Sequence, residues 1–99
     1  MNTIVRTAGF DAWLKALKDP LGKARIIERI RSAERNHFGD CSTVGGGVFE
    51  MRVHVGPGYR VYFMRRTDVL YVLLCGGAKN RQRQDIQRAR EMARRLKEK

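Results

Sequence analysis

VFEMRVHVGPGYRVYF, residues 48–63, is the stretch that decides the fold. Apolar and polar residues alternate on both sides of the breaker Gly56-Pro57-Gly58. Alternation with a period of two is typical of a half-buried strand, and a short loop that contains glycine is a common hairpin connection. We therefore expect two antiparallel strands joined by a tight turn, with the apolar side chains of both strands on one face.

The polar residues of this hairpin form a candidate site. Pairing that is symmetric about Pro57 predicts Val55 opposite Tyr59, His54 opposite Arg60 and Arg52 opposite Tyr62. Directly opposed side chains lie roughly 4.5–5.5 Å apart at Cβ. Guanidinium groups hold phosphate oxygens, and histidine changes its charge near neutral pH. We therefore expect a strip that could bind a phosphate and move a proton, made of Glu50, Arg52, His54, Arg60 and Tyr62.

The residues before the hairpin predict a strand and two helices. Residues 3–6 are a short run of β-forming residues, and residues 10–17 carry apolar side chains at i, i+3, i+4 and i+7. Asp19 followed by Pro20 is a start signal for a second helix, which we expect to end near Asn36. The two helices are expected to form an αα-hairpin.

The residues after Asn36 predict a loop, further strands and a last helix. Residues 37–47 include three consecutive glycines and are expected to be a loop. The apolar run 69–75 predicts a strand covered on both faces, ended by the residues Gly76, Gly77 and Ala78. A basic helix is expected from about Asn80. The fold class is therefore α+β, a single domain over residues 1–99 with a mostly antiparallel sheet of four to five strands.

Charge is the strongest signal of the composition. The 99 residues carry a formal net charge of +11, and residues 79–99 supply nine basic and three acidic side chains, a net of +6. Such a charge favours polyanionic partners, namely nucleic acid, the ribosome or an acidic protein. The chain has no apolar run of 18 residues, so we expect no membrane partner.

The cysteines indicate a cytoplasmic protein without a metal site. Cys41 and Cys75 are the only cysteines, and neither has the spacing of a zinc or redox motif. Reduced thiols suit the cytoplasm. We expect no metal and no other cofactor.

Four segments together resemble the RelE/ParE superfamily of toxin–antitoxin toxins, and most of all its HigB-like "addiction module killer protein" branch. The resemblance covers about residues 3–95, and its segments are FDAWLKALKDPLGKARIIERI, NHFGD, GGGVFEMRVHVGPGYRVYF and LLCGGAKNRQRQDIQRAR. It implies a RelE-like fold and a metal-independent, ribosome-dependent mRNA endoribonuclease (an mRNA interferase). It also implies a monomer that forms a hetero-oligomer with an antitoxin, expected to be a helix-turn-helix protein from the adjacent gene.

The resemblance also suggests roles for single residues. Arg60 matches the strand arginine of the family and is expected to hold the scissile phosphate, with Arg52 beside it. His54 and Glu50 are the candidates for proton transfer, although Glu50 could instead orient Arg52. The residues expected to contact RNA are Lys79, Tyr62, Arg81 and Arg83, and the alternative for Tyr62 is packing at the edge of the core.

One departure from the family keeps other functions open. RelE-like relatives end in a catalytic tyrosine or histidine, whereas neither residue type follows Tyr71 here. The general acid is therefore not identified by the resemblance. The alternatives are a ParE-like inhibitor of DNA gyrase without nuclease chemistry, and a basic nucleic-acid-binding module.

Overall fold

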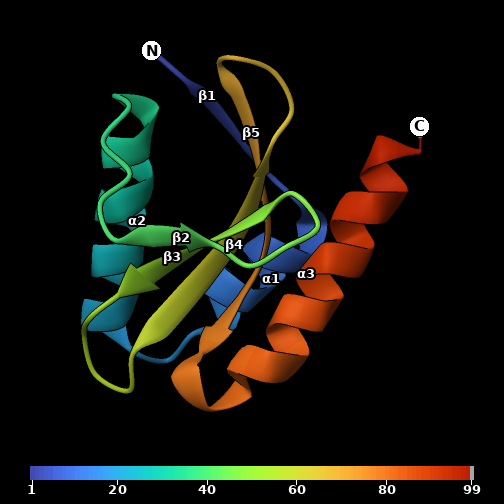
Figure 1. Ribbon diagram of the computed structural model, residues 1–99. Helices are drawn as coiled ribbons and strands as arrows, with labels where there is room; N and C mark the ends of the chain where they lie inside the picture. The colour runs from blue at the N-terminus through green and yellow to red at the C-terminus, as the bar shows by residue number, and fades with distance from the viewer. Residues whose placement is uncertain (99) are drawn as a thin grey trace.

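Five strands form one mixed sheet in the order β1-β5-β4-β3-β2, as the computed structural model of residues 1–98 shows (Figure 1). Only β1 runs parallel to its neighbour, β5. The predicted α+β class is therefore confirmed. The elements in chain order are β1 (Thr3–Arg6), α1 (Ala8–Ala16), α2 (Pro20–Glu34), β2 (Cys41–Thr43), β3 (Val48–Val53), β4 (Tyr59–Arg65), β5 (Leu70–Ala78), a 3-10 turn η1 (Lys79–Arg81) and α3 (Gln82–Lys97).

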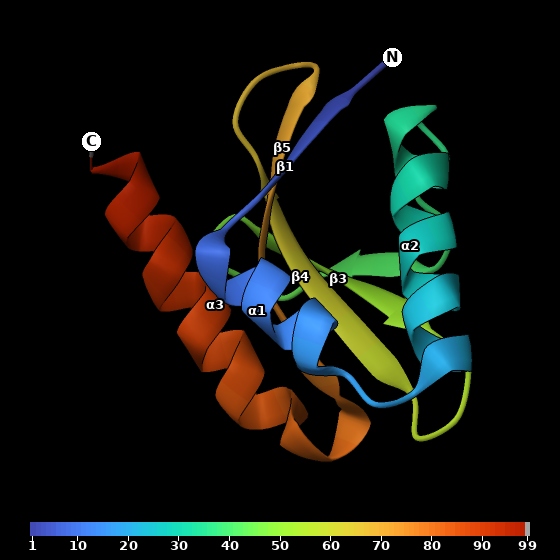
Figure 2. The same cartoon turned by 180° about the vertical axis from the view of Figure 1, so that it is seen from behind.

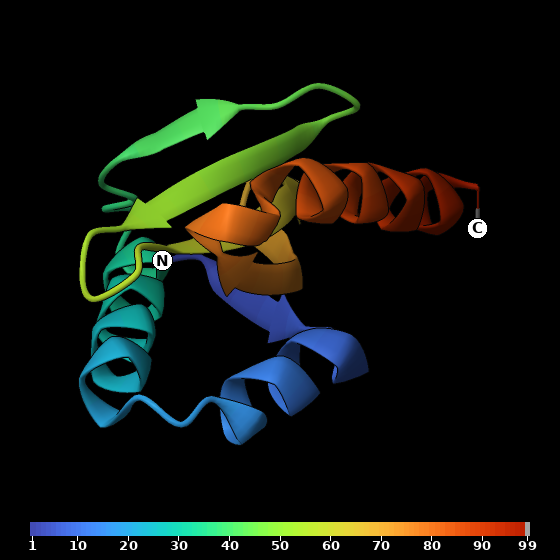
Figure 3. The same cartoon turned by 90° about the horizontal axis from the view of Figure 1, so that it is seen from below.

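Side-chain caps begin the first two helices, and the second helix starts at the Asp19-Pro20 signal that the sequence predicts. The Thr7 hydroxyl accepts a hydrogen bond from the backbone N–H of Phe10 at 3.0 Å. Asp19 accepts one from the N–H of Gly22 at 3.0 Å, and Pro20 occupies the first helical position. Each cap satisfies a backbone donor that a helix start leaves free. The two helices splay apart on the sheet instead of forming the expected side-by-side αα-hairpin (Figure 3).

Helices cover both faces of the sheet. One core cluster joins α1 and α2 to the sheet and includes Phe10, Ile26 and Ile30. A second cluster on the opposite face packs Ala89 and Ala93 of α3 on β4 and β5. Helix α1 lies behind the sheet in Figure 1 and in front of it in Figure 2. The prediction that β5 is covered on both faces is confirmed.

The register of the β3–β4 hairpin differs from the predicted one by two residues. The observed Cα partners are Val53 with Tyr59, Arg52 with Arg60 and Glu50 with Tyr62. His54 lies outside the ladder and does not pair with Arg60. A shift of two residues keeps every side chain on its predicted face, because side chains alternate with a period of two.

The connecting loop explains this register. The chain leaves the ladder after Val53, and the N–H of Gly58 bonds to the carbonyl of Val55 at 3.0 Å. Gly56 and Gly58 have φ angles of 55° and 80°, in the left-handed region that favours glycine. The turn therefore spans residues 54–58 instead of the three residues 56–58 alone.

Two boundaries predicted from the sequence are wrong. Residues 37–47 contain strand β2, which the sequence missed because CST is short and has no alternation. Gly76 and Gly77 do not end β5 but lie inside it. A Cβ on Gly76 would lie 2.5 Å from the Trp13 ring, and one on Gly77 would lie 2.0 Å from Asp85 Oδ2. The glycines therefore allow helices to approach both faces of β5.

Candidate functional site

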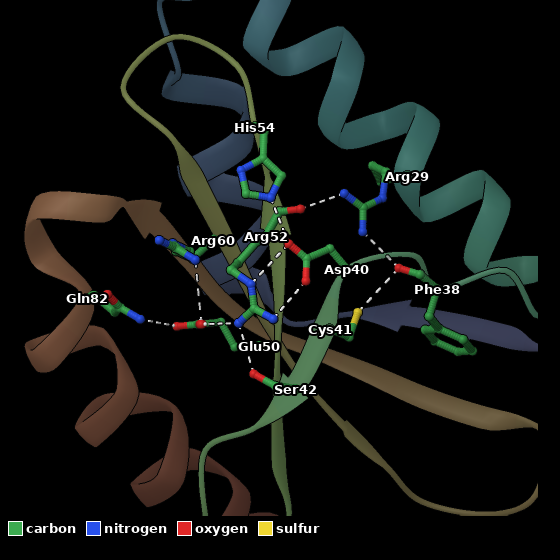
Figure 4. Close-up of polar contacts among 10 residues, drawn as sticks. All are labelled: Arg29, Phe38, Asp40, Cys41, Ser42, Glu50, Arg52, His54, Arg60 and Gln82. Carbon is green, nitrogen blue, oxygen red and sulfur yellow. Dashed lines mark hydrogen bonds and ion pairs between the residues drawn. The ribbon is translucent and has the colours of Figure 1, made fainter.

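Glu50 lies at the centre of a polar cluster on the α3 face of the sheet (Figure 4). Its side chain is 2% exposed. Oε1 lies 3.0 Å from Arg52 Nη1 and 3.6 Å from Arg60 Nη1. Oε2 accepts hydrogen bonds from the Tyr62 hydroxyl at 3.1 Å and from Gln82 Nε2 at 2.8 Å. Both oxygens are therefore occupied, and the geometry favours the orienting role of Glu50 over that of a base.

Arg52 joins Glu50 to the edge of the sheet. Its Nη2 and Nε donate to the two carboxylate oxygens of Asp40 at 2.7 and 3.1 Å, and Nη1 also donates to Ser42 Oγ at 2.8 Å. The carboxylates hold the pKa of this guanidinium above its usual range, the Asp40 hydrogen bond having the largest effect. The donors of Arg52 are thus directed to protein groups on β2 and the loop before it, and this bidentate contact fixes the orientation of the guanidinium.

The loop that carries Asp40 is held by Arg29 of α2. Arg29 Nη1 donates to the carbonyl of Arg52 at 2.5 Å, and its Nη2 donates to the carbonyl of Phe38 at 2.8 Å. Gly39 has a φ of 68°, and a Cβ there would meet the Arg29 guanidinium at 2.6 Å. Arg29, a basic residue of α2, therefore positions the loop that carries Asp40.

His54 is the most exposed member of the cluster. Its side chain is 72% exposed, and Nε2 lies 2.7 Å from Asp40 Oδ2. The hydrogen bond from Arg52, followed by that from His54, lowers the pKa of Asp40 well below its ordinary value. Asp40 is therefore ionised at neutral pH and orients an imidazole that solvent can reach. A carboxylate–histidine pair of this kind can transfer a proton.

Arg60 is nearly buried, with 9% of its surface exposed. Beyond the 3.6 Å contact to Glu50, its Nε is buried and has no hydrogen-bond partner among the described residues. An unpaired buried donor costs about 1–3 kcal/mol. Because this Nε is out of reach of solvent, a ligand of Arg60 would have to bind its terminal Nη atoms.

Tyr62 is a core residue. It is 0% exposed and packs with Val48, Met64 and Leu74 under α3. Burial, followed by the charge of Glu50, raises the pKa of its hydroxyl above the usual range. The buried side chain leaves no surface for the expected contact of Tyr62 with RNA and agrees with the alternative of packing in the core.

The expected RNA contacts Lys79, Arg81 and Arg83 are exposed and follow β5 at the start of α3. The backbone N–H of Lys79 bonds to the carbonyl of Gly58 at 2.7 Å, so this segment adjoins the hairpin loop. The structure brings together Glu50, Arg52, Arg60 and Tyr62 directly, and adds His54 through Asp40.

Sequence reasoning missed three contributors to the cluster, namely Asp40, Ser42 and Gln82. Each lies outside the hairpin, and only the pairing of β2 with β3 and the packing of α3 bring them near it. The one signal in the sequence for a further acidic residue was charge. Glu50 alone leaves the strip of two arginines and a histidine cationic, so a second carboxylate was needed to balance it.

The described residues hold no group of three or more His, Cys, Asp or Glu side chains that could hold a metal ion. Across residues 1–98, every helix is too short or too polar to span a membrane.

Comparison with known proteins gives a family match over most of the chain. Residues 12–97 match the family model described as "Phage derived protein Gp49-like (DUF891)". An uncharacterized protein of Haemophilus influenzae (strain ATCC 51907 / DSM 11121 / KW20 / Rd) is 44% identical over 93 residues, which are 94% of each chain. The family match includes the whole β3–β4 hairpin, residues 48–65.

Proposed function

Because the chain belongs to the Gp49-like family of phage-derived proteins, a toxin-like family related to RelE, we propose that it is the toxin of a type II toxin–antitoxin pair and cleaves mRNA on the ribosome. The observation that carries the nuclease part is the cluster on β3 and β4, in which an exposed imidazole bound to a carboxylate lies beside two arginines. The net charge of +11 suits an RNA substrate.

The proposed reaction is internal transesterification. The 2′-hydroxyl oxygen forms a bond to the scissile phosphorus, and the bond from phosphorus to the 5′-oxygen breaks. The products are a 2′,3′-cyclic phosphate and a 5′-hydroxyl, and the proton lost by the 2′-hydroxyl is balanced by the one gained by the 5′-oxygen. No metal is needed for this step.

Each residue of the cluster has a proposed role. His54, oriented by Asp40, carries the proton. Arg60 binds a phosphate oxygen through its terminal Nη atoms, since its only ion-pair contact within residues 1–98, to Glu50, is as long as 3.6 Å, and Arg52 adds positive charge next to it. Glu50 holds the two guanidinium groups in place, Tyr62 anchors Glu50 through its hydroxyl, and neither residue touches RNA. Lys79, Arg81 and Arg83 contact the RNA backbone.

The test is primer extension on a message translated in a purified system. Arg60→Ala, Arg52→Ala and His54→Ala should each reduce cleavage, and general acid–base catalysis makes the loss at His54 about 10²–10⁴-fold. Arg65→Ala is the matched control, because Arg65 lies on the same strand but has the opposite parity. Circular dichroism checks that each variant is folded. Unchanged cleavage by all three variants would contradict the proposed site.

Two observations favour a second candidate, a ParE-like inhibitor of DNA gyrase that has no nuclease activity. The carboxylates already occupy the donors of Arg52, and no Tyr or His follows Tyr71. A supercoiling assay that responds to the protein while translated mRNA stays intact would select this function. A protein that binds nucleic acid but leaves growth unaffected on expression would instead be a basic binding module.

A further inference from the structure

A cavity on the face opposite to the polar cluster is lined mainly by aromatic side chains. Its volume is about 360 Å³, and Phe38, Phe49, Phe63 and Tyr71 contribute to its wall. Phe63 stacks between Phe38 and Phe49, with ring centroids 5.5 and 5.4 Å away. Apart from Ser42, which also accepts a hydrogen bond from Arg52, the strand residues that line it have odd numbers. Glu50, Arg52, Arg60 and Tyr62 have even numbers. The cavity therefore lies outside the proposed RNA site.

Strand β2 borders this cavity and is the last strand of the sheet. Thr43 and Cys41 line the cavity and pair with Phe49 and Met51 of β3. The backbone hydrogen bonds that point toward β3 are made by even-numbered residues. The carbonyl of Asp40 accepts from the N–H of Arg52, and the N–H of Val44 donates to the carbonyl of Val48. By the alternation of an antiparallel ladder, the backbone N–H and C=O groups of Cys41 and Thr43 point away from β3.

The other edge of the sheet is different. Just before β1, the backbone N–H of Asn2 donates to the carbonyl of Glu34 at 2.8 Å. The side-chain amide of Asn2 donates to the carbonyl of Ala33 at 3.0 Å. Helix α2 therefore occupies the beginning of that edge. Strand β2 presents outward backbone groups beside an apolar cavity, which is the combination that binds an extended peptide by strand addition.

We propose that the outer edge of β2 and the aromatic cavity bind an extended segment of an acidic partner protein. The segment pairs with the backbone of Cys41 and Thr43 and places one aliphatic or aromatic side chain in the cavity. Acidic residues flank this anchor, since Arg65 lines the cavity and the chain carries a net charge of +11. If the protein is the proposed toxin, this partner is the antitoxin. The identity of the partner therefore rests on the proposed function, whereas the binding of a peptide at β2 does not rest on it.

A random-peptide library displayed on phage provides the probe. We expect the protein to select peptides with one large apolar residue between acidic residues. Thr43→Lys, which places a long charged side chain at the cavity, should weaken binding of the selected peptides at least about tenfold. Thr3→Lys, on the other edge strand, is the matched control and should not weaken it, because it adds the same charge elsewhere.

Hydrogen exchange followed by NMR locates the bound peptide. The amides of Cys41 and Thr43 should exchange rapidly in the free protein and become protected when a selected peptide binds. Thr43→Pro removes only the outward N–H, so it should also weaken binding while the remaining sheet amides stay protected. Both Thr43 variants should cleave mRNA like the wild type if the proposed function holds, which separates the two proposals.

Three results would overturn the inference. The first is a failure to enrich peptides of this kind, and the second is equal binding by Thr43→Lys and the wild type. The third is that a single-stranded RNA oligonucleotide, but no selected peptide, shifts the NMR signals of Phe38 and Tyr71. That outcome would assign the cavity to a nucleobase stacked on aromatic rings.

Discussion

Glu50 lies between two guanidinium groups, a phenol and an amide, with almost no contact with solvent. Removal of one partner from a buried ion pair leaves the other charges uncompensated, and this costs about 3–5 kcal/mol. The same residue is therefore expected to determine both the stability of the sheet and the geometry of the candidate site.

Glu50→Gln should lower the free energy of unfolding by about 3 kcal/mol, as measured by urea denaturation. Glu91→Gln is the control, because Glu91 pairs with Arg94 and Arg95 on the exposed face of α3. Exposed pairs contribute only about 0–1 kcal/mol. Equal losses in the two variants would show that the Glu50 network does not stabilise the fold.

Asp40 should make stability depend on pH in the acid range. Its pKa is lowered from 3.8, first by the hydrogen bond from Arg52 and then by that from His54. A depressed pKa in the folded state gives stability that is present above pH 3.8 and is lost as the pH falls through the lower folded-state value.

The melting temperature of the wild type should therefore exceed that of Asp40→Asn near neutral pH, and the difference should shrink as the pH falls below about 4. Thermal melts followed by circular dichroism between pH 2 and pH 7 measure this. Asp68→Asn is the control, since Asp68 also contacts an arginine, Arg65, but its side chain is 98% exposed. A constant difference at all pH values would contradict the assignment.

Strand β5 can pack against helices on both faces because two of its residues, Gly76 and Gly77, have no side chain. Gly76 and Gly77 lie under Trp13 of α1 and Asp85 of α3, at distances that leave no space for a Cβ. Asp85 is 3% exposed, and burial raises the pKa of its carboxyl. The packing of both helix layers on the central part of the sheet therefore relies on this glycine pair.

Gly77→Ala should destabilise the protein by about 1–3 kcal/mol, because the added methyl group overlaps Asp85. Gly9→Ala in α1 is the matched control. Its nearest neighbour would be Thr7 Oγ1 at 3.9 Å, so the alanine has room. The control should stabilise the protein by about 0.4–1 kcal/mol through the unfolded state. Urea midpoints that change alike in both variants would argue against tight packing at Gly77.

At the scale of the whole molecule, the net charge of +11 governs the proposed partners. Nine of the basic residues lie in residues 79–99, and α3 carries most of them along one side of the sheet. Charged surfaces of this kind accelerate association with an acidic protein or with RNA and are screened by salt.

The complex with the proposed antitoxin should therefore weaken strongly as salt increases from about 50 mM to 1 M, where the screening length falls to about 3 Å. Isothermal titration calorimetry at several salt concentrations tests this. The peptides selected on β2 provide a comparison, because a variant with the acidic flanks replaced by glutamine should show a smaller salt dependence. Equal affinity at low and high salt would contradict an interface based on charge.

The sequence by itself determined most of the helices and strands and the faces of the β3–β4 hairpin, although it missed β2. Alternation in residues 48–63 placed Glu50, Arg52, Arg60 and Tyr62 on one face, and it remained correct after a register shift of two residues because the period of side chains is two. The cap at Asp19 was also readable, since it is a local interaction between neighbours in the chain. The family resemblance likewise agrees with the Gp49-like match at the level of a toxin-like family.

Only the tertiary structure decided which residues meet. Asp40 reaches Arg52 and His54 because β2 pairs with β3, and Gln82 reaches Glu50 because α3 packs across the sheet. Burial of Tyr62 likewise depends on α3, which lies 20 residues or more away in sequence. A periodic pattern specifies the direction of a side chain, whereas its partner and its exposure depend on long-range packing that no local pattern records.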